Sequence, residues 1–209
     1  MLRKQILVVT LMLLGCNLFA QKDPAAKKVL DAVSAKVKTF KGVKADFTIK
    51  SVTSKGKPNG TKTGNIYIKG QKYLLKQGKI EIICDSKTIW NFDGAKTITV
   101  SPADENNQTL SPQNLLSNFY DKDFNYKLIS SVGNFFEIEL TPLDKRKSFK
   151  KVNVFVDKAK NMITRALILD QSNNKVEFCL NNMNTTSPIL DNLFTFDKSK
   201  YPKDVEVLD

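Results

Sequence analysis

Alternation of apolar and polar residues in short runs along residues 64–100 is the feature that most constrains how this chain can fold. Ile66 and Ile68 alternate with polar neighbours, and the same period of two continues through Ile80–Cys84 and Trp90–Phe92. Gly, Asp, Ser or Lys residues stand at the breaks between these runs. Such a pattern is typical of antiparallel strands that are buried on one face only.

Further runs of the same kind extend the predicted sheet. About ten strands in up-and-down order, two short helices and no βαβ alternation predict an α+β fold whose sheet curls. Polar loops are expected at Thr53–Thr63 and Ser101–Leu110. The other predicted strands are Val43–Val52, Tyr126–Ser131, Phe135–Thr141, Lys150–Asp157, Met162–Asp170 and Lys175–Asn182, with short ones at Leu193–Phe196 and Val205–Val207.

Two segments have the signature of helices that begin with a cap followed by proline. Asp23-Pro24 starts an amphipathic helix that Gly42 ends, and its apolar stripe fits either a core helix or a cover over an open sheet. Ser111-Pro112 starts a shorter helix, which needs tertiary contact because one or two helical turns are marginal alone. Its apolar side consists of Leu115, Leu116 and Phe119.

Residues 1–20 have the composition of a secretory signal peptide. Arg3 and Lys4 precede the apolar run Ile6–Leu14, and the segment ends at the small residue Ala20. An alternative is that Cys16, which follows Leu-Leu-Gly, is lipidated after cleavage by a lipoprotein signal peptidase. Because the residue before that glycine is usually small, cleavage after Ala20 is favoured. Residues 21–209 then form one exported domain, anchored only if Cys16 is lipidated.

The composition disfavours catalysis, metal binding and nucleic-acid binding. Histidine is absent, which removes the usual general base and the commonest zinc ligand. Removing the signal peptide lowers the net charge only from +12 to +10, but this charge is spread over lysines and only three arginines exist. We interpret it as favouring solubility and attraction to anionic membranes or acidic partners. No catalytic residue, metal site or cofactor is therefore predicted.

Two cysteines remain after residue 20. Cys84 is predicted to face inward, whereas Cys179 alternates with polar residues on the other face, so no disulfide is expected. The paired carboxylates Asp121 and Asp123 are interpreted as solvated loop residues.

The apolar face of the predicted sheet is the remaining candidate site. If the sheet curls without closing and a helix covers it reversibly, the space between them suits a long apolar ligand. The alternative is an ordinary filled core, which for most single residues is the simpler interpretation.

Five stretches of sequence carry a family resemblance: Val43–Thr48, Gly64–Lys69, Cys84–Trp90, Leu140–Pro142 and Phe194–Val205. In this order and spacing they resemble the LolA family, the periplasmic outer-membrane lipoprotein carriers of Gram-negative bacteria. The resemblance covers nearly all of residues 21–209. It implies an unclosed (half) antiparallel β-barrel with a helical lid over an apolar cavity that holds the acyl chains of lipoproteins.

The resemblance also implies partners and a mode of action. The chain would be a non-enzymatic, cofactor-free chaperone of triacylated lipoproteins, and a monomer is expected. It would accept its cargo from an inner-membrane ABC release complex and deliver it to an outer-membrane acceptor where one exists. Two alternatives stay open: a lipid-anchored acceptor or a lipid-sensing regulatory domain of the same fold, and a small hydrolase.

Ten residues are predicted to form the cavity and its lid. The resemblance places Leu74 on the cavity rim and Leu116 on the lid helix. Where the family has Arg-Pro to close the lid, this chain has Gly70-Gln71, so Lys69 or Lys72 is the candidate substitute. Face alternation adds the remaining lining residues Phe47, Ile49, Ile66, Ile68, Ile82, Trp90, Leu115 and Phe119.

Overall fold

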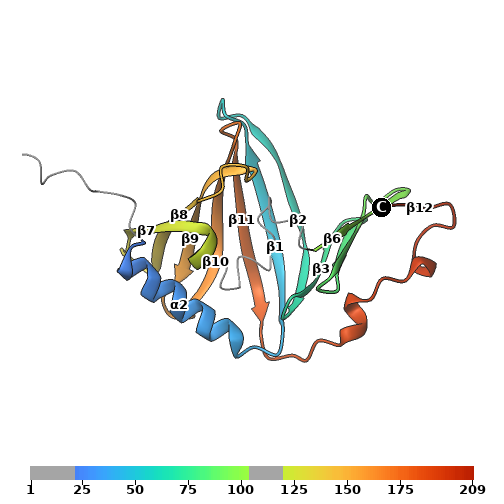
Figure 1. The fold of residues 1–209 in the computed structure, drawn as a ribbon, viewed down its shortest axis with the longest axis horizontal. Coiled ribbons are helices and arrows are strands. Elements are labelled where there is room, and N and C mark those ends of the chain that lie inside the picture. Colours follow the sequence, from blue (N-terminus) through green and yellow to red (C-terminus); the bar gives the residue numbers. More distant parts are fainter. Residues whose placement is uncertain (1–21, 104–119) are drawn as a thin grey trace, which may run out of the picture.

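The structure, a computed structural model, describes residues 22–103 and 120–209 (Figure 1). Within these ranges twelve strands form a single sheet. They are β1 (Val43–Val52), β2 (Pro58–Lys69), β3 (Lys72–Gln77), β4 (Ile80–Cys84), β5 (Thr88–Phe92), β6 (Thr97–Pro102), β7 (Phe124–Ser130), β8 (Phe135–Pro142), β9 (Phe149–Asp157), β10 (Met162–Asp170), β11 (Lys175–Asn184) and β12 (Glu206–Leu208).

The strand order shows that the sheet curls without closing. It runs β12-β6-β5-β4-β3-β2-β1-β11-β10-β9-β8-β7, so β7 and β12 are its two ends. Every neighbouring pair is antiparallel except β12 with β6, which is parallel. Figure 1 shows the resulting arch, with β1, β2 and β11 at its centre. The predicted unclosed antiparallel half-barrel is confirmed.

Helix α2 (Pro24–Lys38) begins where the sequence predicts. The Asp23 side chain accepts hydrogen bonds from the backbone N–H groups of Ala25 and Ala26, and Pro24 occupies the first turn. The helix buries Ala26, Leu30 and Val33 against the sheet, so it covers the sheet near β7 and β10 (Figure 1). The second predicted helix, from Ser111, lies outside the described residues.

Three local predictions were wrong. The predicted loop Thr53–Thr63 is strand from Pro58 onward, because its backbone pairs with β1 although its side chains are exposed on both faces. The predicted strand Leu193–Phe196 is replaced by the 3₁₀ turn η2 (Asp191–Phe194). Asp121 and Asp123 lie in the single-turn helix α3 (Tyr120–Asp123) and not in a loop. A further 3₁₀ turn, η3 (Lys198–Lys200), precedes β12.

Apolar side chains pack on both faces of the sheet. The inner face, which α2 covers, carries the main core, where Val152, Val154 and Ile138 are completely buried. The outer face of β3–β6 carries two smaller clusters beneath residues 185–205, called here the C-terminal arm. Cys84 is buried on the inner face, and Cys179 lies opposite Thr48 on the outer one, so the predicted separation of the two free thiols is confirmed.

Candidate functional site

The inner face is continuous across the sheet because the register aligns apolar residues from strand to strand. In the β2–β4 half, Ile66 lies opposite Leu75, which in turn lies opposite Ile82. At the centre, Phe47 lies opposite Leu180. In an antiparallel sheet, residues directly opposite each other project to the same face. The inner face therefore carries core residues from β7 to β5, where Ile89 is buried and the exposed Asn91, opposite Ile82, ends the apolar row.

This surface is only partly covered by the described residues. Phe47 and Ile66 are buried, whereas Ile49, Leu75 and Ile82 are partly exposed beside them. Partly exposed apolar side chains that adjoin a main core mark a place where an apolar ligand can be added. Partly buried apolar residues that pack against this core include Val29, Val37, Phe40, Leu128, Phe136, Ile168 and Met183.

The environment of the inner face disfavours charge. Tyr73 and Cys84 lie opposite each other there, and both are buried. Burial raises the pKa of the Tyr73 hydroxyl to about 12 and also raises the pKa of the Cys84 thiol. Tyrosine and cysteine are already neutral at physiological pH, and burial extends this neutrality to higher pH.

The structure brings together five of the ten predicted lining residues. Phe47, Ile49, Ile66, Ile68 and Ile82 all belong to the inner-face core. Three others, all on the predicted short helix, lie outside the described residues: Leu115, Leu116 and Phe119.

The other two predicted residues, Leu74 and Trp90, lie on the outer face. Leu74 is opposite Ile83, and Ile83 is opposite Trp90, so these three side chains project away from the inner face. Leu74 is 3% exposed because Ile189 and Phe194 of the C-terminal arm pack in the same cluster. The two residues therefore hold the arm in place rather than line the inner face.

Aromatic contacts continue this outer cluster. The rings of Trp90 and Phe196 stack with centroids 5.3 Å apart, and Tyr201 packs edge-on against Phe92 at 5.1 Å. The Tyr201 hydroxyl donates a hydrogen bond of 2.6 Å to Glu81, which also forms an ion pair with Lys76. Burial and the carboxylate of Glu81 raise the pKa of Tyr201, so it remains a donor.

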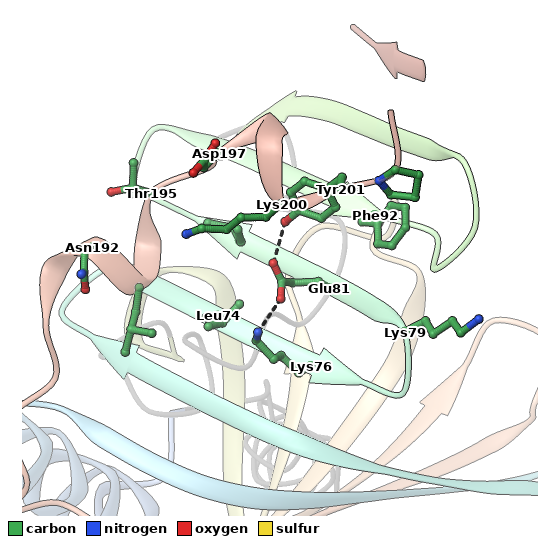
Figure 2. Close-up of a pocket in the computed structure, with 13 residues that line it drawn as sticks. Leu74, Lys76, Lys79, Glu81, Phe92, Asn192, Thr195, Asp197, Lys200 and Tyr201 are labelled. Carbon is green, nitrogen blue, oxygen red and sulfur yellow. Dashed lines mark hydrogen bonds and ion pairs between the residues drawn. The ribbon is translucent and has the colours of Figure 1, made fainter. Parts of the chain in front are cut away.

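The same region contains a pocket of about 390 Å³ between the arm and strands β3–β5 (Figure 2). Figure 2 shows Lys76, Glu81 and Tyr201 joined in one row across it. Its lining mixes apolar side chains, such as Leu74, Ile83 and Phe92, with charged ones, such as Lys76 and Glu81. This lining suits an acyl chain less well than an apolar surface does, because hydrocarbon would remove its charged groups from water.

Alternation alone could not show that both faces of the sheet are covered, but one feature of the sequence indicates it. Leu74-Leu75 and Ile82-Ile83 are adjacent apolar pairs within single strands. Adjacent residues of a strand project to opposite faces, so such pairs indicate a sheet buried on both sides. This signal identifies the covered outer face of β3 and β4.

The described residues hold no group of three or more His, Cys, Asp or Glu side chains that could bind a metal ion. Among the helices of residues 22–103 and 120–209, none has the length and apolar character needed to cross a membrane.

Comparison with known proteins identifies the family of this chain. The family model described as outer membrane lipoprotein carrier protein LolA matches residues 38–197. No curated protein sequence matches the chain. An uncharacterized conserved protein from Thermus thermophilus shares the fold, with a TM-score of 0.58, 14% sequence identity, and coverage of 88% of this chain and 98% of that one.

Two more distant structures are of note. A LolA superfamily protein from Nitrosomonas europaea has a TM-score of 0.49 and 12% identity, over 82% of this chain and 97% of its own. The MucA/MucB complex of Pseudomonas aeruginosa has a TM-score of 0.41 and 12% identity, over 83% of this chain and 61% of the other.

Proposed function

The chain belongs to the LolA family, and from this membership we propose that it carries lipoproteins through the periplasm by binding their acyl chains. The cargo would come from an inner-membrane ABC release complex and go to the outer membrane, or to an acceptor there. The chain would act without a catalytic group or cofactor.

The observation that supports this proposal is the partly covered inner face. Ile49, Leu75 and Ile82 give an acyl chain an apolar surface beside a packed core. At about 0.8 kcal/mol per buried CH₂, exposing one sixteen-carbon chain to water costs on the order of 12 kcal/mol. A carrier must cover such a chain completely, which requires an apolar surface of this kind.

The proposed lining is therefore the inner-face set Phe47, Ile49, Ile66, Ile68 and Ile82, joined by Leu75. Leu115, Leu116 and Phe119 remain proposed lid residues. Leu74 and Trp90 are proposed to contribute indirectly, by holding the C-terminal arm against the back of the sheet.

Native mass spectrometry of the protein isolated from the periplasm tests the proposal. With a triacylated lipoprotein co-expressed, we expect a one-to-one complex; with the same lipoprotein lacking its acylated cysteine, we expect none. Equal binding of both forms would exclude acyl-chain recognition, and no binding of either would exclude the carrier function.

The Leu-Leu-Gly sequence before Cys16 supports a second candidate, a lipid-anchored acceptor or lipid-sensing domain of the same fold. Labelling cells with radioactive palmitate distinguishes the two. Incorporation at Cys16 would support the anchored form, whereas an unlabelled protein that begins at Gln21 would support the free carrier.

A further inference from the structure

The hairpin that joins the central strands β1 and β2 carries positive charge without matching negative charge. Residues 50–63 contain four lysines and no aspartate or glutamate. The hairpin between β1 and β2 lies in this segment, and every residue from 54 to 63 is exposed. The carrier proposal gives no role to this hairpin, because its exposed side chains are polar.

Neighbouring turns bring more lysines to the same end of these strands. Lys175 lies opposite Val52, and the backbone N–H of Ser54 donates a hydrogen bond of 3.0 Å to the side chain of Asn174. Lys150 donates one of 2.6 Å to the side chain of Asn173 in the same turn. Figure 1 shows the β1–β2 and β10–β11 turns together at the top of the central strands. We name this cluster the basic tip: Lys55, Lys57, Lys62, Lys150 and Lys175.

The charge of the basic tip is not balanced by ion pairs. In the part of the chain that the structure describes, none of its five lysines belongs to a salt bridge. Asp170 is the acid of the adjoining turn, and it accepts hydrogen bonds from the backbone and side chain of Asn174. Glu177, further along β11, is paired with Arg165 at 3.3 Å. The tip thus presents a local excess of cations to its surroundings.

The chemistry of the tip indicates which anionic surface it fits. Protein interfaces are anchored by Trp, Tyr and Arg side chains in desolvated pockets. Residues 50–63 and 170–176 contain no aromatic residue and no arginine, and none of the exposed large apolar side chains of the described residues lies there. Lysines on a projecting hairpin, without apolar anchors, match the diffuse negative charge of phospholipid headgroups.

We propose that the basic tip docks on the anionic headgroups of a lipid bilayer. Lys62 lies opposite Ile49, so the tip adjoins the partly exposed apolar residues of the inner face. Docking through the tip therefore brings one end of the inner face to the bilayer surface, where an acyl chain enters or leaves. The docking itself requires no cargo and does not depend on the carrier proposal.

Vesicle sedimentation of the purified full-length mature protein tests the proposal. We expect binding to vesicles that contain phosphatidylglycerol, no binding to pure phosphatidylcholine, and a steep loss of binding as salt is added. The variant Lys55→Glu/Lys57→Glu/Lys175→Glu should lower the partition coefficient roughly 100-fold, since each lysine near an anionic surface contributes about fivefold.

The matched control is Lys28→Glu/Lys38→Glu/Lys41→Glu, which makes the same charge change at exposed lysines of α2 and the turn after it. It should change the partition coefficient by less than about threefold. Equal losses in both variants would overturn the proposal, because net charge and not the tip would then drive binding. The proposal would also be overturned if the wild-type protein did not bind the anionic vesicles but bound immobilised polyglutamate. That result would favour an acidic protein partner.

A second measurement on the same samples separates this proposal from the carrier function. A fluorescent fatty-acid probe should bind the tip variant as well as it binds the wild type, because the three substituted lysines do not line the inner face. Loss of probe binding in the tip variant alone would overturn the assignment of these lysines to membrane docking. Failure of the wild type to bind the probe counts against the carrier function and leaves the vesicle result to decide the docking proposal.

Discussion

Lys69 and Asp191, which are 122 residues apart in the sequence, form an ion pair of 3.1 Å. Lys72 binds the other carboxylate oxygen of Asp191 at 3.0 Å, and Lys69 also donates to the carbonyl of Ile189. The hydrogen bonds of Lys72 and Lys69 lower the pKa of Asp191, so its carboxylate stays charged. Lys69 and Lys72, each predicted as a candidate substitute for the family's lid arginine, thus hold the C-terminal arm to the β2–β3 turn.

Replacing Asp191 with alanine should loosen the arm while leaving the sheet intact. Because the carboxylate is 62% exposed and solvent screens its ion pairs, the free energy of unfolding should change little. Amide hydrogen exchange should instead accelerate locally in residues 189–196. Asp123→Ala, at an exposed acid outside the arm, is the control and should leave exchange in the arm unchanged. Unaltered exchange in the Asp191→Ala protein would show that the ion pairs do not hold the arm.

Leu74 and Leu75 offer a direct test of which face binds an acyl chain. They are adjacent in β3 but project to opposite faces. Leu75→Asn should lower the affinity for a fatty-acid probe about tenfold or more, because it adds a polar group to the inner face. Leu74→Asn should leave that affinity unchanged in the folded protein and lower the free energy of unfolding by about 2–4 kcal/mol. Probe titration and urea unfolding of both variants measure these effects, and the reverse pattern would place the acyl chain on the outer face.

Much of the sheet could be predicted because its inner face follows alternation in short runs, which a sequence shows directly. Residues 58–63 could not, because a strand exposed on both faces has no apolar period and forms only by pairing with β1. The C-terminal arm could not be predicted for a different reason. Leu193–Phe196 has the residues of a strand, but Phe194 is buried by its contact with Leu74 and Ile83, which no local pattern reveals. That contact also explains why apolar Leu74 and Trp90 are accommodated on the outer face, to which the strand register directs them.

Gly64 lies where no other residue fits. A Cβ atom at this position would lie 2.0 Å from the carbonyl oxygen of Lys76 and 2.6 Å from the ring of Phe47. Because a backbone atom cannot move aside without distorting β3, Gly64→Ala should lower the free energy of unfolding by about 3 kcal/mol or more. Urea unfolding measures this loss.

Gly42→Ala is the comparison for this substitution, since its nearest contact is the flexible end of the Ile189 side chain. It should cost less than Gly64→Ala. Equal stability of the wild type and the Gly64→Ala protein would show that β2 and β3 can separate at this point.

Asp23 makes the stability of the domain depend on pH. Its carboxylate accepts a hydrogen bond of 2.9 Å from the backbone N–H of Leu128 in β7 and caps α2 through Ala25 and Ala26. These bonds, the one from Leu128 foremost, lower its pKa in the folded state. A lowered pKa stabilises the folded state fully above the unfolded-state pKa of about 4. This stabilisation is lost as the pH falls through the folded-state pKa.

Asp23→Ala should therefore lower the free energy of unfolding by about 1–2 kcal/mol at neutral pH, the usual value of an N-cap. The difference from the wild type should shrink as the pH falls below the unfolded-state pKa and through the lowered folded-state pKa, where the wild-type carboxylate becomes protonated. Urea unfolding of both proteins across this pH range measures the difference, and other carboxylates cancel because both proteins share them. A difference that does not change with pH would show that the charge of Asp23 contributes nothing.

The single tryptophan reports on the arm and not on the proposed cargo. Trp90 stacks on Phe196 at 5.3 Å with the ring planes 8° apart, on the outer face. Phe196→Ala should expose the indole to water and shift its emission to longer wavelength, with a loss of about 1–2 kcal/mol from the missing ring contact. Phe135→Ala, at an exposed ring of β8, should leave the emission unchanged. A saturated acyl chain carrying a quencher at its end should leave Trp90 unquenched in the wild type, because the sheet separates the indole from the inner face; strong quenching would place the chain beneath the arm.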